Sequence, residues 1–352
     1  MSIQTELTRI KGAKADLQSW VEENGVTVPD GTLIDGLVEL AKTVETGGGG
    51  DDTQIDALID RSITEISNSR VTKIGEYAFY YCKILTTANF PAATSIGGNS
   101  FYSCNSLTTV DFPVATSIGS NAFQNCAKLT TANFPAVTSI IINAFRGCSS
   151  LTTVDFPVAT SIGSYAFQNC VKLTTANFPA ATSIGNSAFY YCKILTTANF
   201  PAATSIDSNA FQDCSSLTTV DFPVATSIGS NSFYSCNSLT TVDFPVATSI
   251  GSNAFRGCSS LTTVDFPVAT SIGSYAFRDC SSLTTLILRN PDVVCTLSNT
   301  NAFTSTPIAS GTGYIYVPSA LVDSYKAETN WSTFADQIRA IEDYPDITGG
   351  AA

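Results

Sequence analysis

A strict period of 22 residues constrains this chain more than any other feature of its sequence. Self-similarity with a period of roughly 20 to 29 residues is typical of a solenoid built from leucine-rich-repeat coils. Because one coil cannot bury its apolar side chains alone, neighbouring coils must stack to share a core. The period therefore predicts a repeat β-solenoid. Its clearest markers are ten cysteines at equal intervals of 22 residues: Cys82, Cys104, Cys126, Cys148, Cys170, Cys192, Cys214, Cys236, Cys258 and Cys280.

Each coil carries a short strand motif, as in the segment FYSCNSLTTVDFPVATSIGSNA. Leu107, Val110 and Phe112 of this segment follow the spacing L-x-x-L-x-L. Alternate side chains of a strand point to opposite faces. We therefore expect Val110 and Phe112 in the core, and Thr109 and Asp111 on the outside.

The remainder of the coil predicts a second strand and two turns. Proline follows the first strand and ends it, because proline has no N–H to donate. A second extended stretch, residues 116–118 in the same coil, precedes a glycine that recurs in most coils. The glycine predicts a turn with positive φ, although Ile141 and Asp207 replace it in two coils. The Asn-Ala-Phe stretch that follows predicts a helical or 3₁₀ turn.

Atypical sequence flanks the array at both ends, as an open solenoid needs to cover its edge strands. Ile63, Ile66, Val71 and Ile74 fall in register with the first full coil and predict an N-terminal cap. A last strand followed by amphipathic helices is expected at the other end, with Trp331, Phe334, Ile338 and Ile341 facing inward. The predicted parts are a helical module at 1–45, a Gly-rich linker at 46–53, an N-terminal cap at 54–75, the repeat array at 76–288, a C-terminal cap at 289–343 and a tail at 344–352.

The composition excludes several classes of function. The chain has no histidine, so Ser-His-Asp and Cys-His catalysis and histidine metal ligands are excluded. The net charge is −12 and no Lys/Arg cluster occurs, so nucleic acid is not expected as a partner. Neither a signal peptide nor an apolar run long enough to enter a membrane is found. No catalytic or nucleotide-binding motif occurs either, so we expect a protein that is not an enzyme and needs no cofactor.

The cysteine column has two interpretations, of which one is favoured. Stacked cysteines could form a metal array or a disulfide framework. Their Cβ atoms would point in the same direction, however, which is poor geometry for a disulfide, and each cysteine lacks a C-x-x-C partner. We therefore expect buried reduced thiols that act as small apolar side chains, and no metal.

An outward-facing column of Asn and Asp follows the predicted strands. Three of its carboxylates are in consecutive coils and must repel one another, which could bind a cation or a cationic partner. Alternatively, the Asn and Asp side chains bond to one another and solvate the concave face. The five carboxylates of this concave acidic ladder are Asp111, Asp155, Asp221, Asp243 and Asp265.

The two positions after the first phenylalanine of each coil vary most from coil to coil. Tyr and Arg are favoured as interface anchors, so these positions are candidates for contact with a protein or glycan ligand. The alternative is neutral drift on a surface that has no partner. Together with Ile141 and Ile142, which precede a phenylalanine, the candidate contact residues are Tyr80, Tyr81, Tyr102, Arg146, Tyr190, Tyr191, Tyr234, Arg256 and Arg278.

The array resembles the BspA-like leucine-rich repeat family, and the resemblance extends from about residue 62 to 343. The motif of that family joins an L-x-x-I-x-L-P strand to I-G-x-x-A-F-x-x-C. Here the matching residues are Leu107, Val110, Phe112, Pro113, Ile118, Gly119, Ala122, Phe123 and Cys126. The resemblance implies a leucine-rich repeat fold and adhesion at a cell surface, with a surface protein or glycan as ligand.

The first 44 residues resemble a different group, the short modules of tail and other structural proteins of bacteriophages that infect Firmicutes. The segments KADL at 14–17, GVTVPDGT at 25–32 and IDGL at 34–37 carry this resemblance. It implies a virion or tail protein as a partner of residues 1–45. Two short helices there would bury little apolar surface alone, so homo-oligomerisation through them is a further expectation.

Three functions follow from these patterns. The first is a phage tail-associated or other virion protein that binds a bacterial surface. The second is a bacterial BspA-like adhesin at the cell surface. The third is a structural spacer whose length is set by the number of coils.

Overall fold

The computed structural model describes residues 62–348. Contacts divide the chain into two compact units, one ending at Leu151 and one beginning at Thr152, and each unit is described by itself. The predicted helical module at 1–45, the linker at 46–53 and the first part of the N-terminal cap at 54–61 lie outside the described residues.

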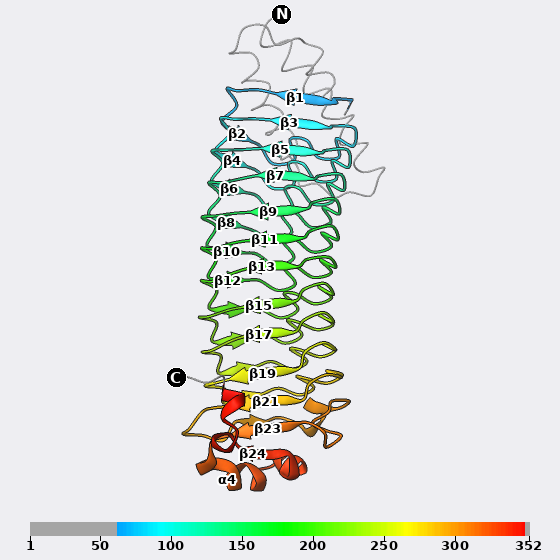
Figure 1. The fold of residues 1–352 in the computed structure, drawn as a ribbon. Helices are drawn as coiled ribbons and strands as arrows, with labels where there is room; N and C mark the ends of the chain where they lie inside the picture. The colour runs from blue at the N-terminus through cyan, green and yellow to red at the C-terminus, as the bar shows by residue number, and fades with distance from the viewer. Residues whose placement is uncertain (1–61, 349–352) are drawn as a thin grey trace, which may run out of the picture. The chain divides into compact units, whose positions relative to one another are not determined.

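The first unit is a stack of two-stranded coils. Consecutive coils pair in parallel, and residues 22 apart are register partners, such as Ile66 with Ala88 and Ile74 with Ile96. The cap coil therefore continues the array, as expected (Figure 1). The longer strands are β1 (Glu65–Ser67), β3 (Thr87–Asn89), β5 (Thr109–Asp111) and β7 (Thr131–Asn133), and the shorter ones are β2 (Lys73–Ile74), β4 (Ser95–Ile96), β6 (Ser117–Ile118) and β8 (Ser139–Ile140).

The second unit repeats the same coil. Its longer strands are β9 (Thr153–Asp155), β11 (Thr175–Asn177), β13 (Thr197–Asn199), β15 (Thr219–Asp221), β17 (Thr241–Asp243), β19 (Thr263–Phe266), β21 (Thr285–Leu288), β23 (Tyr314–Val317) and β24 (Ile338–Ala340). Its shorter strands are β10 (Ser161–Ile162), β12 (Ser183–Ile184), β14 (Ser205–Ile206), β16 (Ser227–Ile228), β18 (Ser249–Ile250), β20 (Ser271–Ile272) and β22 (Thr296–Leu297). The shorter strands pair in order, whereas the longer ones form three ladders: β9 to β13, β15 with β17, and β19 to β24.

Columns of identical side chains fill the interior of both units. In the first unit, Phe79, Phe101, Phe123 and Phe145 stack with ring centroids 4.8 to 5.3 Å apart. Val110 and Phe112 are buried while Thr109 and Asp111 are exposed, as the alternation predicted. Buried aromatic pairs contribute about 0.5–1.5 kcal/mol each beyond the area that they bury. The repeat β-solenoid predicted from the period is confirmed.

The segment between the second strand and the next cysteine is not helical, contrary to the expectation from Asn-Ala-Phe. It is a series of tight turns in which alternate N–H groups have different partners. The N–H groups of Tyr77, Phe79 and Tyr81 donate to carbonyls of the next coil, and those of Tyr80 and Cys82 donate within their own coil. In a helix, the N–H groups would donate to carbonyls of the same coil. The observed path instead joins neighbouring coils.

The recurrent glycine permits close packing and does not have a positive φ, which corrects the sequence-based prediction. A Cβ at Gly119 would lie 2.3 Å from the backbone nitrogen of Gly98. Asp207 occupies the same column, and its N–H bond to the previous coil measures 3.0 Å, against 2.8 Å at Gly185. Positive φ occurs elsewhere, in the turns, where Gly147 has a φ of 74°.

The C-terminal cap buries the predicted side chains but contains little helix. It comprises η1 (Thr300–Phe303), η2 (Ser319–Leu321), α4 (Val322–Ala327), η3 (Trp331–Gln337), η4 (Ile341–Asp343) and η5 (Pro345–Thr348). Asn330 has a φ of 69°, which separates α4 from η3. Ile338 is part of strand β24 and pairs with Ile315. Trp331, Phe334, Ile338 and Ile341 are all buried, as expected.

The end of the core is sealed by hydrogen bonds as well as by apolar contact. The indole N–H of Trp331 donates to the Cys295 carbonyl at 2.6 Å, and the Cys295 N–H donates to the Tyr325 hydroxyl at 2.9 Å. These bonds satisfy polar groups that burial would otherwise penalise. Tyr344, the first residue of the predicted tail, is part of this packing, because its ring contacts that of Tyr316 edge-on.

Candidate functional site

The variable turns form one candidate surface in each unit, and we call the outward side chains of these turns the turn face. Within residues 62–348, the candidate contact residues differ widely in exposure. Tyr80 is only 6% exposed, because it packs among Tyr77, Tyr81 and Tyr102, whereas Ile142 is 44% exposed. The other candidates are intermediate: Tyr81, Tyr102, Ile141, Arg146, Tyr190, Tyr191, Tyr234, Arg256 and Arg278.

Two coils, one in each unit, carry the same group of turn residues. In the first unit the group is Tyr81, Lys83 and Ile84, in which the Lys83 ammonium lies 5.3 Å from the centre of the Tyr81 ring and Ile84 is 47% exposed. In the second unit Lys193 lies 4.2 Å from the centre of the Tyr191 ring, and Ile194 is 42% exposed. We call each trio a turn group.

The tyrosine of each turn group has a backbone conformation that bulky residues rarely adopt. Its φ is 58° at Tyr81 and 63° at Tyr191, in the left-handed region that favours Gly and Asn. Other coils place Ser103 or Gly147 at the equivalent position. An aromatic residue there costs of order 1 kcal/mol, and such costs are often retained at functional sites.

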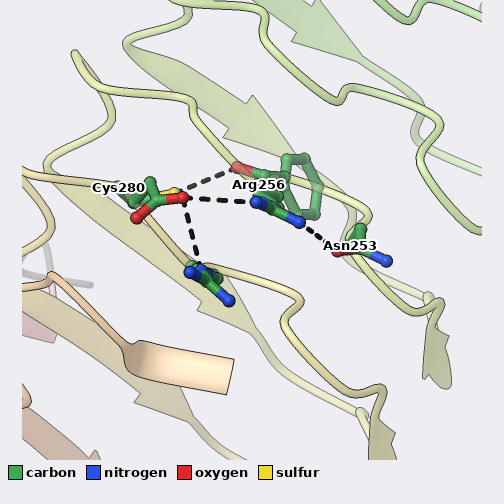
Figure 2. Close-up of polar contacts among 6 residues, drawn as sticks. Asn253, Arg256 and Cys280 are labelled. Carbon is green, nitrogen blue, oxygen red and sulfur yellow. Dashed lines mark hydrogen bonds and ion pairs between the residues drawn. The ribbon is translucent and has the colours of Figure 1, made fainter. Parts of the chain in front are cut away.

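Arginines of the turn face are partly neutralised within the second unit. Arg256 and Arg278 both approach one carboxylate oxygen of Asp279 at 3.5 Å, and Arg256 also bonds to Asn253 (Figure 2). The guanidinium of Arg256 lies 5.5 Å from the centre of the Tyr234 ring. These contacts place both cations beside one carboxylate at the surface.

The cysteine column is interior and serves packing. All 11 cysteines are free and buried. The Cys104 thiol donates to the Phe79 carbonyl at 3.0 Å, and Cys280 makes the same bond to Phe255 (Figure 2). Burial raises the pKa of the Cys280 thiol to about 12, so the reactive thiolate is scarce at neutral pH. Within residues 62–348, no group of three or more His, Cys, Asp or Glu could hold a metal ion.

The outward column of Asn and Asp on the longer strands forms a second candidate surface, which we call the strand face. Asn133 donates to Asp111 at 2.7 Å in the first unit, and Asn177 donates to Asp155 at 2.8 Å in the second. This bonding between neighbours is the alternative that the sequence analysis left open. It accounts for two of the five carboxylates.

The three remaining carboxylates of the strand face belong to consecutive coils of the second unit. Asp265 is bound by both Nε and Nη2 of Arg289, with Nη2 at 2.7 Å from the carboxylate. Desolvation, followed by the charges of Asp221 and Asp265, raises the pKa of Asp243. Among the described residues, Asp221 and Asp243 have no hydrogen-bonding or ion-pair partner for their side chains.

Sequence reasoning missed part of the turn face. Lys83, Lys193, Ile84 and Ile194 follow a cysteine and are not among the predicted contact residues, although the repeated letters YYCKIL in two coils could have identified them. Tyr165 and Tyr275 were also missed. They are half-buried residues with φ near 60°, a property that no sequence pattern displays.

A profile described as BspA type leucine rich repeat region (6 copies) matches residues 72–196, 116–225 and 204–314 of this chain. That profile describes a repeat and specifies no catalytic activity. A search of curated proteins found no match. In the part of the chain that the structure describes, no helix is both long and apolar enough to span a membrane.

Several solved structures are similar to this chain. A leucine-rich repeat protein from Bacteroides ovatus is 24% identical over 80% of this chain and 84% of that one, with a TM-score of 0.48. A leucine rich cell surface protein from Faecalibacterium prausnitzii is 23% identical, with coverages of 78% and 89% and a TM-score of 0.38. A leucine rich repeat protein from T. pallidum is 26% identical, with coverages of 54% and 83% and a TM-score of 0.37. Because the profile matches together span residues 72–314, well over half of the sequence, the chain belongs to the family of BspA type leucine rich repeat proteins.

Proposed function

We propose that this protein is a recognition protein of the BspA-like adhesin kind, which acts at a cell surface and binds a surface protein or glycan through its turn groups. Membership of the repeat family supports a binding role. A similar protein from Faecalibacterium prausnitzii is described as a cell surface protein. Solenoids of this type offer extended surfaces for binding, with no catalytic centre required.

The observation that carries the proposal is the recurrence of the turn group in both units. Tyr81, Lys83 and Ile84 combine a preoriented aromatic ring, a cation and an exposed aliphatic side chain. Tyrosine is enriched among the residues that dominate binding energy. The tyrosine of each turn group has a positive φ, at a cost of order 1 kcal/mol.

The phage tail function rests on residues 1–45, which lie outside the described residues, and it stays a prediction. A spacer function likewise stays a prediction, since it would need no particular side chain on the turn face. The two alternatives and the adhesin proposal give different results in one binding experiment.

The experiment replaces both turn groups with residues that another coil already uses. Tyr81→Ser, Lys83→Asn and Ile84→Ser reproduce Ser103, Asn105 and Ser106, and the corresponding changes are made in the second unit. Binding of the fluorescent full chain to epithelial cells and to intact Firmicutes cells is measured by flow cytometry. We expect binding to epithelial cells to fall at least about tenfold.

The control is Val114→Ala, which removes an exposed side chain elsewhere in the first unit and should leave binding unchanged. Equal binding of the wild type and the turn-group variant would contradict the proposal and favour a spacer. Binding restricted to the bacterial cells would favour the phage tail function instead.

A further inference from the structure

The strand face of the second unit contains two carboxylates that the rest of the molecule leaves without a donor. Asp155 accepts from Asn177 and Asp265 is held by Arg289. Among the described residues, Asp221 and Asp243 have neither kind of partner. They are register partners on neighbouring strands, and the backbones of such strands lie about 4.8 Å apart.

The order of the coils explains why these two positions differ. Where an Asn follows an Asp, its amide N–H group donates back to the carboxylate of the previous coil, as from Asn133 to Asp111. Three Asp coils in succession provide no such donor, and Asp243 therefore keeps an unfavourable neighbour on each side. The pKa of Asp243 is raised accordingly, by desolvation and by Asp221 and Asp265.

An exposed apolar row accompanies these charges. The residue after the strand proline is valine in the same three coils, and Val224, Val246 and Val268 are 42%, 39% and 37% exposed. The two preceding coils have the smaller Ala180 and Ala202 at this position. Acidic side chains and exposed valines thus coincide coil by coil, three residues apart along the chain.

The adjoining part of the same face is already covered by a segment of the chain. In the register of β19, β21 and β23, Asp265 is followed by Ile287 and then Tyr316. Ile287, Tyr316 and Ile341 form a buried apolar cluster on which Ile347 packs. Residues 341–348 therefore cover one end of the strand face, while Arg289 neutralises the next position along it.

We propose that the open part of the strand face, formed by Asp221, Asp243, Val224 and Val246, docks a segment of a partner protein in which basic and apolar residues alternate. An arginine of that segment would form ion pairs with Asp221 and Asp243, as Arg289 does with Asp265. Its apolar residues would pack on Val224 and Val246, much as Ile347 packs on the cluster of Ile287, Tyr316 and Ile341. This site is separate from the turn groups, so the inference goes beyond the function proposed above.

The experiment measures binding of the full chain to a fluorescein-labelled synthetic peptide of alternating Arg and Val by fluorescence anisotropy. Asp221→Asn with Asp243→Asn introduces the residue that the same column uses at Asn177 and Asn199, so the coil has a native precedent for it. This variant should bind the peptide about tenfold more weakly. Val224→Ala with Val246→Ala should weaken binding about threefold, because exposed valines contribute less area.

Two controls separate this site from general charge attraction. Asp155→Asn removes the same charge from a carboxylate that already has a donor and should change the affinity less than twofold, which is the scale of a screened surface charge. A peptide of alternating Glu and Val should not bind. Thermal unfolding of each variant verifies that it is folded.

Three results would overturn the inference. One is absence of binding of the Arg-Val peptide to the wild type, and another is an equal loss of affinity in Asp155→Asn and in the double Asp variant. The third is displacement of the peptide by millimolar calcium at constant ionic strength, which would identify a cation site in place of a peptide site.

Discussion

In the first unit, the coils at residues 76–97 and 98–119 can be compared position by position. Phe79 and Phe101 are both fully buried, as are Cys82 and Cys104. The outward residues of the turn differ, because Lys83 and Ile84 of one coil correspond to Asn105 and Ser106 of the other. Stacking repeats every interior contact once per coil, so the interior columns tolerate little change. The turns face solvent, and they are free to differ.

The largest effect is expected where an interior position is enlarged. In Gly119→Ala the new Cβ would meet backbone atoms of Gly97 and Gly98 at 2.3–2.7 Å. Backbone cannot yield as a side chain can, so we expect a loss of about 2 kcal/mol in the free energy of unfolding, measured by urea denaturation. The exceptions at Ile141 and Asp207 show that the coil can adjust, which limits the cost.

Gly98→Ala is the matched control for this prediction. A Cβ at Gly98 would lie 3.4 Å from the nearest atom, the Ser120 carbonyl oxygen, and other coils have serine at this position. Its stability should stay within about 0.5 kcal/mol of the wild type. Equal losses in the two variants would show that the recurrent glycine is not required for close packing.

A smaller change in stability, of opposite sign, is expected where an interior residue differs from the residue that most coils have at that position. Ser232 is fully buried, and its hydroxyl has no hydrogen-bond partner, whereas most coils have alanine there. Ser232→Ala should therefore stabilise the protein by about 1 kcal/mol. Ser100→Ala should act similarly in the first unit, and the two gains should add. A loss of stability in either variant would mean that the hydroxyl has a role that packing does not reveal.

The smallest effect is expected at the surface. Because the pKa of Asp243 is raised, its ionised form is disfavoured in the folded chain. The resulting penalty is present above the folded pKa and is relieved as the pH falls through it. Asp243→Asn should gain a few tenths of a kcal/mol near neutral pH, since exposed charges are screened. Urea denaturation should show no gain below the ordinary pKa of aspartate. A gain that persists in acid would assign the effect to packing.

The comparison between interior and turns also explains what the sequence could predict. The coil, its two strands and its buried columns were predictable, because a side chain repeated every 22 residues must meet its own copies. The role of Gly119 was not predictable. A glycine that permits two backbones to approach closely and a glycine that permits a positive φ give the same sequence pattern. The non-helical turns were missed for a similar reason. Residues of many types, such as Tyr81 and Asn99, have the left-handed conformation in these turns, so no sequence pattern indicates it.

The two candidate surfaces were predictable to different degrees. The acidic column of the strand face follows directly from alternation along the strand, and all five of its aspartates occupy that face. Which of them lack a donor depends on the order of the coils and on Arg289, which is 24 residues from Asp265. The turn face stays a predicted contact surface. The burial of Tyr80 could not be predicted, because it arises from aromatic packing between coils that a single coil sequence does not express.

The most direct measurement of whether the repeated columns are interior is the reactivity of the thiols. The account predicts that the native protein reacts with a thiol reagent such as Ellman's reagent only on the timescale of unfolding, because the cysteines are buried and the pKa of Cys295 is raised to about 12. After denaturation without reductant, all 11 thiols should react. Rapid reaction of several thiols in the native protein, or fewer than 11 after denaturation, would contradict it.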